Sequence, residues 1–88
     1  MIKQTVKILN RHGLHTRPAT MLVTTTARFK SEIFLTYKGV RVNAKSILGV
    51  LVLAVEPDAE VILDANGPDE KEALAALVEL VANKFNTE

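Results

Sequence analysis

The chain has 88 residues, of which 48% are apolar and 24% charged, a composition that fits one small globular domain over residues 1–88. It contains no cysteine, which excludes disulfides, thiolate metal sites and cysteine nucleophiles. The longest apolar run, residues 47–55, is far shorter than the ~20 residues of a membrane helix. The first residues do not resemble a signal peptide. We therefore expect a soluble, cytoplasmic protein that does not insert into a membrane.

The charge is distributed unevenly, although the formal net charge is only +1. Residues 1–45 carry nine Lys or Arg and one acid, whereas residues 46–88 carry two Lys and nine acids. Basic and acidic strands could lie side by side, or a basic face could attract an acidic or phosphorylated partner. The aromatic residues are not interleaved with the basic ones, so a nucleic-acid surface is not expected.

In chain order, the first half predicts a strand, a helix and a hairpin. Residues 2–9 alternate imperfectly between apolar and polar, which indicates a half-buried strand, and residues 10–14 form a loop. Thr16 is a candidate N-cap, and Pro18 suits the first turn of the helix that comes next. Residues 32–37 and 40–43 read as two strands, joined by a bulged turn with Gly39 in the left-handed region. The inward helix face is predicted to hold Ala19, Leu22, Val23 and Thr26.

The second half predicts two further helices around one strand. Residues 46–54 contain a continuous apolar run that could be a buried strand, but Ser46 as N-cap and Gly49 inside the run favour a short helix. Residues 60–65 form a strand, and Asp69 is expected to cap the last helix. The buried stripe of that helix is predicted to hold Leu74, Leu77, Val78, Val81 and Phe85. The order β-α-β-β-α-β-α predicts an α+β, open-faced two-layer sandwich with three helices on one face of the sheet.

The stretch RHGLHTRP, residues 11–18, concentrates both histidines at the joint between strand and helix. The first amides and the dipole of a helix that begins near Thr16 suit an anion, and the Arg17 guanidinium adds donors for phosphate oxygens. Positive surroundings keep the imidazole of His15 neutral and nucleophilic. The joint is therefore a candidate site for phosphohistidine, with the backbone amides of Thr16 and Arg17 as phosphate donors.

Other chemistries have weaker support in the sequence. His12 and His15 have i, i+3 spacing, but neither cysteine nor a nearby carboxylate completes a metal-ligand set. No G-x-S-x-G motif is present, and a small phosphate-handling enzyme would need a glycine-rich cradle that Asn10 and Asn43 lack. His15 could also be only a solvated loop residue. We expect no metal and no cofactor.

Ser46 and the apolar residues after it form a second motif. Ser46 is expected to cap its helix, and a phosphate added to its hydroxyl would be tolerated by the helix dipole. Ile47, Leu48 and Leu51 cannot all face the core from so short a helix, so some should form an exposed patch for a partner.

The motifs GLHTRPAT (residues 13–20) and KSILGV (residues 45–50), with the element order over the whole chain, resemble HPr, the histidine-containing phosphocarrier family of the bacterial phosphoenolpyruvate:sugar phosphotransferase system. The resemblance implies a four-stranded antiparallel sheet in the order 1-4-2-3. It implies a stoichiometric carrier, not an enzyme with turnover of its own, in which Nδ1 of His15 accepts a phosphoryl group from phosphorylated Enzyme I and passes it to Enzyme IIA. Arg17 would stabilise the phosphohistidine.

The resemblance also implies that Ser46 is open to phosphorylation by a dedicated kinase/phosphorylase. Leu14, Thr20, Ile47, Leu48 and Leu51 would dock partners, and we expect a monomer. A regulatory HPr-like protein that uses the same His15 remains an alternative. The chain departs from the family pattern at His12, where a small polar residue is usual, so the role of His12 stays open. It departs again at Ala54 and Asp58, where glycines are frequent, so the turn after the second helix is expected to differ.

Overall fold

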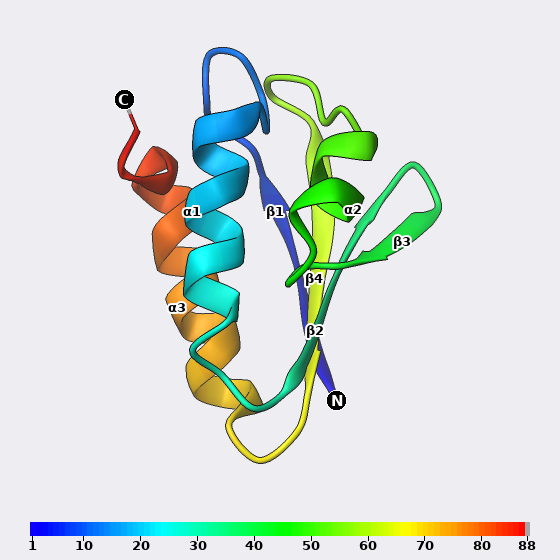
Figure 1. The fold of residues 1–88 in the computed structure, drawn as a ribbon, viewed down its shortest axis with the longest axis vertical. Coiled ribbons are helices and arrows are strands. Elements are labelled where there is room, and N and C mark those ends of the chain that lie inside the picture. Colours follow the sequence, from blue (N-terminus) through cyan, green and yellow to red (C-terminus); the bar gives the residue numbers. More distant parts are fainter. Residues whose placement is uncertain (88) are drawn as a thin grey trace.

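The computed structural model describes residues 1–87 and has two layers (Figure 1). The strands form one antiparallel sheet in the order β1-β4-β2-β3, and the three α-helices cover one face of it. Both the sandwich and the strand order expected from the resemblance are therefore confirmed. The elements, in chain order, are β1 (Ile2–Lys7), α1 (Thr16–Thr26), β2 (Glu32–Tyr37), β3 (Val40–Asn43), α2 (Ile47–Val52), β4 (Glu60–Asn66) and α3 (Glu70–Ala82), with a short 3₁₀ turn, Lys84–Asn86, at the end.

The core lies between the sheet and the helices and is mainly aliphatic. Alternate residues of the two central strands, β2 and β4, point inward and are buried, and α1 and α3 bury their apolar stripes against them. The side chains at the centre of this layer, all with at most 1% of their surface exposed, include Ala19, Leu22, Ile33, Leu35, Leu63 and Leu77. Burial of this kind is worth about 1.5–3 kcal/mol for each large aliphatic side chain.

The sheet order explains the uneven distribution of charge. Basic β1 lies beside acidic β4, and the register places Lys3 opposite Asp64 and Lys7 opposite Glu60. The Asp64 carboxylate accepts a hydrogen bond from the Arg41 guanidinium at 2.9 Å, and that guanidinium also lies 3.7 Å from the centroid of the Phe34 ring. The two halves of the chain therefore neutralise each other across the sheet.

The helix starts differ from two of the predictions. The N-cap of α1 is His15, not Thr16, which is the first helical residue. Asp69 is the N-cap of α3, but its side chain makes no capping bond. Its carboxylate instead accepts hydrogen bonds from the loop after α1, because it lies within reach of the backbone N–H groups of Lys30 and Ser31, both at 2.9 Å, and of the Ser31 hydroxyl.

The β2–β3 turn and the end of the last helix also differ from prediction. Tyr37 pairs with Val40, which leaves the two-residue turn Lys38-Gly39, with φ values of 49° and 81°. This is a primed turn without a bulge, because the strand pairing fixes the register despite the unfavourable lysine. Phe85 is buried, but it belongs to the 3₁₀ turn and not to α3.

Two other predicted inward residues, Val23 and Val78, are only half-buried. In the turn after α2, Ala54 and Asp58 adopt φ values of 49° and 64°. They therefore keep the left-handed backbone that glycine favours, at a cost of about 1–2 kcal/mol each.

Asp69 should make the stability of the fold depend on pH. Its hydrogen bonds to Ser31 and Lys30 stabilise the charged form and lower the pKa of the carboxyl to about 2. This stabilisation is complete above the unfolded pKa of about 4 and is lost as the pH falls through about 2. We expect Asp69→Asn to lower the melting temperature by several degrees at pH 7, and the gap between the variant and the wild type to shrink between about pH 4 and pH 2.

Glu72→Gln is the control, because it removes an exposed carboxylate from the same helix without touching the loop after α1. Thermal unfolding followed by circular dichroism at several pH values measures both variants. An equal decrease in melting temperature for the two variants would show that the hydrogen bonds between Asp69 and residues 30 and 31 contribute nothing to stability.

Candidate functional site

The loop between β1 and α1 is held in place by backbone hydrogen bonds at one end of the molecule, where the C-terminal turn also lies (Figure 1). The amide of Gly13 donates to the carbonyl of Asn10 at 3.1 Å, and the amide of Leu14 donates to the carbonyl of Val55 at 3.0 Å. The Asn10 side chain is fully buried and donates to the carbonyl of Lys84 at 2.9 Å. The loop is therefore fastened both to the turn after α2 and to the C-terminal turn.

Gly13 is required by this arrangement. Its φ of +70° lies in the left-handed region, and a Cβ added to it would lie 2.0 Å from the carbonyl oxygen of Val55. Because a carbonyl of the main chain cannot yield as a side chain can, any other residue would force the loop away from the turn after α2. The glycine therefore allows the close contact that sets where α1 begins.

His15 occupies the N-cap of α1 in an extended conformation, with φ −78° and ψ −171°. The first helical hydrogen bond runs from the amide of Ala19 to the His15 carbonyl, at 3.0 Å. The amides before Ala19 have no partner within the helix, and Pro18 has no amide hydrogen, so the available donors are those of Thr16 and Arg17. These two amides and the positive end of the helix dipole directly follow His15 in the chain.

The structure brings His15 and Arg17 together in one shallow hollow of about 290 Å³. Arg11, His12 and Thr87 complete its lining. Within the part of the chain that the structure describes, Arg17 makes no hydrogen bond or ion pair, and its side chain is exposed. The hollow thus presents guanidinium groups, imidazoles and a hydroxyl around His15, a set of groups that suits a phosphoryl group.

Arg11 and Thr87 were not among the site residues predicted from sequence. Arg11 directly precedes His12 in the chain, so its position in the sequence could have indicated that it belongs to the site. Thr87 is brought to the site by the C-terminal turn, where it accepts a hydrogen bond from the Asn10 amide at 3.1 Å. Nothing in the sequence near the histidines predicts that contact.

A second hollow, of about 340 Å³, is also lined by both histidines. His12, His15 and Thr16 contribute to it from the loop and α1, while Leu51 and Glu56 contribute from α2 and the turn after it. It connects the histidine site to one end of α2. Glu56 places a carboxylate in this hollow, which no pattern in the sequence indicated.

Ser46 is the N-cap of α2, as predicted, and its hydroxyl accepts a hydrogen bond from the Gly49 amide at 3.2 Å. The segment before it is fastened to the C-terminal end of α1, because the Thr26 hydroxyl donates to the carbonyl of Ala44 at 2.9 Å. His15 lies at the opposite end of α1, which has 11 residues and is therefore about 16 Å long. The structure places Ser46 and His15 at different ends of α1.

The predicted docking residues do not all lie on the surface. Leu48 has 73% of its surface exposed, whereas Ile47 and Leu51 are half-buried. Val52, which was not predicted, is 78% exposed one helical turn after Leu48, so these two form the apolar face of α2. The remaining two predicted docking residues lie outside α2.

Leu14 has only 3% of its surface exposed, so its side chain belongs to the core and not to a docking surface. Its burial follows from the loop contact with Val55, which turns the side chain inward. Thr20 is exposed on α1, and its hydroxyl donates to the carbonyl of Thr16 at 2.8 Å.

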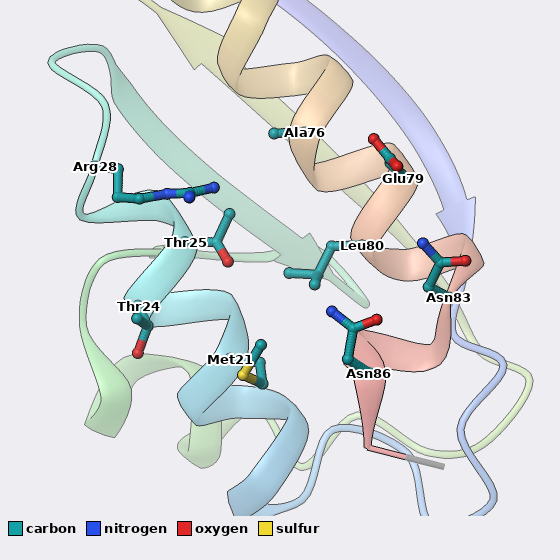
Figure 2. A pocket seen from close by; sticks show the side chains of 9 residues that line it. All are labelled: Met21, Thr24, Thr25, Arg28, Ala76, Glu79, Leu80, Asn83 and Asn86. Atoms are coloured by element: carbon teal, nitrogen blue, oxygen red, sulfur yellow. The ribbon is translucent and has the colours of Figure 1, made fainter.

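A further hollow, of about 350 Å³, lies between α1 and α3 and holds none of the predicted site residues (Figure 2). Arg28 reaches toward it from the loop after α1, and Glu79 and Asn83 line it from the other side (Figure 2). Within residues 1–87, no group of three or more His, Asp or Glu is arranged to hold a metal ion. No helix in that range is both long and apolar enough to cross a membrane.

Comparison with known proteins identifies the family. The sequence model described as the PTS HPr component phosphorylation site matches residues 2–83. Phosphocarrier protein HPr of Treponema pallidum is 47% identical over 88 residues, which is 100% of both chains. The crystal structure of HPr from Thermoanaerobacter tengcongensis superposes with a TM-score of 0.96 at 44% identity, covering 100% of this chain and 99% of the other. The chain belongs to the HPr family, the phosphocarrier proteins of the phosphotransferase system.

The Bacillus subtilis catabolite repression protein Crh is also similar. Its crystal structure superposes with a TM-score of 0.76 at 44% identity, covering 96% of this chain and 97% of that one. Overall similarity therefore does not by itself separate a sugar-transport carrier from a regulatory relative.

Gly13 can be tested against Gly39, because both have positive φ. A Cβ at Gly39 would meet nothing within 4 Å, so Gly39→Ala should cost only the left-handed strain of about 1–2 kcal/mol. Gly13→Ala adds the clash with Val55 and should destabilise the protein clearly more. Urea denaturation of both variants measures the difference in the free energy of unfolding. Equal decreases for the two variants would show that the loop around Gly13 accommodates the added Cβ without loss of stability.

Proposed function

We propose that this chain carries a phosphoryl group on His15, which it accepts from phosphorylated Enzyme I and passes to Enzyme IIA domains. The observation that carries the proposal is the position of His15 at the N-cap of α1, in one hollow with Arg17, in a chain of the HPr family. Such a carrier works stoichiometrically, as a cytoplasmic monomer without a metal or cofactor, and has no turnover of its own.

The transfer depends on the groups around His15. The lone pair of Nδ1 attacks phosphorus, the N–P bond forms as the bond between phosphorus and the donor breaks, and the donor keeps that electron pair. Catalysis of such a transfer consists mainly of positioning and of stabilising charge on the phosphoryl oxygens. The amides of Thr16 and Arg17 and the Arg17 guanidinium supply donors for those oxygens. The reverse attack by an acceptor on Enzyme IIA releases the group.

A regulatory role with the same histidine is the second candidate. The similarity to Crh brings a regulatory relative into consideration, but the presence of His15 argues against the catabolite-repression paralogue, which lacks this histidine. The two roles differ in the fate of the phosphoryl group: a sugar-branch carrier passes it to Enzyme IIA, whereas a regulator responds through docking or through the state of Ser46.

The test of the function is phosphorylation by Enzyme I with radiolabelled phosphoenolpyruvate. We expect the wild type to acquire acid-labile, base-stable label and His15→Ala to acquire none. Label that moves onward to a sugar-specific Enzyme IIA supports the carrier, and label that stays on the chain supports the regulator. An unlabelled wild type would refute the proposal.

Arg17 should matter for transfer and not for folding. Its side chain is exposed and has no hydrogen-bond or ion-pair partner within residues 1–87, so we expect Arg17→Ala to leave the melting temperature within a few degrees of the wild type. The rate of phosphorylation by Enzyme I should fall at least tenfold, the effect of losing one charge-assisted hydrogen bond of about 1.5–3 kcal/mol. Arg17→Lys should recover only part of the rate. A large loss of stability with intact transfer would contradict this role.

Ser46 supports a regulatory proposal, in which a kinase/phosphorylase adds phosphate to its hydroxyl. The segment before Ser46 is bonded to the C-terminal end of α1, whereas His15 lies at the N-terminal end, so a charge at Ser46 would act through partner docking rather than within the histidine site. The apolar face of α2, Leu48 and Val52, begins beside it. A negative charge at this position would oppose an apolar or acidic partner surface.

We therefore expect Ser46→Asp to remain folded and to slow phosphorylation by Enzyme I at low salt. Ser46→Asn is the matched control, because asparagine also caps a helix but carries no charge. Rapid-quench kinetics with labelled donor measure both. Equal rates for the two variants would show that charge at this position has no effect on docking.

A further inference from the structure

His12 lies against the histidine that we propose to be phosphorylated. The ring centroids of His12 and His15 are 5.8 Å apart, and the rings form a T-shaped pair with an interplanar angle of 79°. Both rings line the hollow that also contains the guanidinium groups of Arg11 and Arg17. The function of the family does not require a second imidazole beside His15. The position of His12 in the hollow therefore needs a separate explanation.

We infer that His12 is a positioning residue of the phosphoryl site, whose protonated imidazole donates a hydrogen bond to the phosphoryl group on His15 and makes the stability of phospho-His15 depend on pH. This inference rests on the proposed function and names a regulation of the same site.

The backbone sets the position of His12. The hydrogen bond from the Gly13 amide to the Asn10 carbonyl closes a four-residue turn in which Arg11 and His12 are the two central residues. Its first residue, Asn10, is fully buried, and its last, Gly13, is wedged against Val55. The turn is therefore anchored at both ends, and its central side chains lie at the rim of the hollow.

The separation of the rings suits a bridging phosphoryl group. Phosphoryl oxygens on His15 extend beyond the ring edge by the N–P and P–O bonds, while charge-assisted N–H···O bonds span about 2.7–2.9 Å. The 5.8 Å between the ring centroids is comparable to the sum of these lengths, so a phosphoryl oxygen on His15 has the reach to meet the His12 ring.

The charges around His12 explain why phosphorylation would change its protonation. Arg11 and Arg17 bring positive charge to this hollow, and Glu56 brings a negative charge to the neighbouring hollow that both histidines also line. A phosphoryl group adds about −1.5 to −2 charges beside the ring. That negative charge favours the protonated form of His12, so the phosphorylated protein should hold a proton there more firmly than the free protein does.

Linkage fixes the direction of the effect. Because the phosphorylated form binds more protons at His12, lowering the pH stabilises phospho-His15 relative to the free protein. We expect the effect between about pH 5 and pH 8, the range in which histidine changes charge. The phosphorylated carrier would accordingly hold its group more firmly under mildly acidic conditions and release it more readily under alkaline ones.

The test compares wild type with His12→Asn and His12→Ala, each first shown to be folded by thermal unfolding. Asparagine retains a donor of similar reach but does not titrate, and alanine has neither property. Each protein is labelled by Enzyme I with radiolabelled phosphoenolpyruvate, and the equilibrium between phospho-Enzyme I and phospho-His15 is measured from pH 5.5 to pH 8. At each pH, the equilibrium constant of the wild type is divided by that of His12→Asn. This ratio cancels the pH dependence of Enzyme I and of His15 itself.

We expect that ratio to be near one at pH 8 and to favour the wild-type phospho form by about three- to tenfold at pH 5.5, the range of a partly exposed charge-assisted hydrogen bond. Ring-proton NMR shifts should show His12 protonated to a higher pH in the phosphorylated protein than in the free one. A ratio independent of pH, with unchanged NMR titration, would overturn the inference and leave the carrier function intact. Failure of the wild type to accept label would overturn both.

Discussion

The contact between the loop before α1 and the Val55 carbonyl determines the geometry of the whole site. The Leu14 amide donates to that carbonyl, and Gly13 approaches it so closely that no side chain could fit. This backbone contact sets the residue at which α1 begins, and so places His15, rather than Thr16, at its N-cap.

The chemistry of the site depends on where charge is available. The available amides of α1 are few because Pro18 contributes none, so Arg17 and the dipole of α1 supply much of the positive potential. Arg11 adds to it from the tip of a turn anchored by the buried Asn10. A carrier must hold a phosphoryl group firmly enough to transport it and loosely enough to release it. A shallow, open hollow with exposed donors suits that balance better than a buried site.

The structure separates Ser46 from His15 and so gives the molecule two distinct regions. Ser46 caps α2 near the end of α1 that is remote from His15, whereas Leu51 and Glu56 meet the histidines at the opposite end of α2. The exposed face formed by Leu48 and Val52 lies between them along α2. A partner that covers α2 while it reaches His15 would therefore contact both regions, so a charge at Ser46 could affect transfer without altering the histidine site.

The local patterns of the sequence determined the elements, their order and the central candidate residues. Alternation in the strands, the apolar stripes of α1 and α3, and the capping role of Ser46 are short-range effects, and the structure confirms them. His15 and Arg17 were predicted together because the start of a helix concentrates donors within a few residues.

The features that the sequence did not reveal are those that depend on distant segments. Asp69 bonds to the loop after α1 instead of capping α3, and Leu14 turns into the core because Val55 fixes its backbone. Thr87 and Glu56 reach the histidines only because the C-terminal turn and the turn after α2 pack at the same end of the molecule. Local propensity decides which element forms, but close packing decides which side chains meet, and that depends on contacts between residues far apart in the chain.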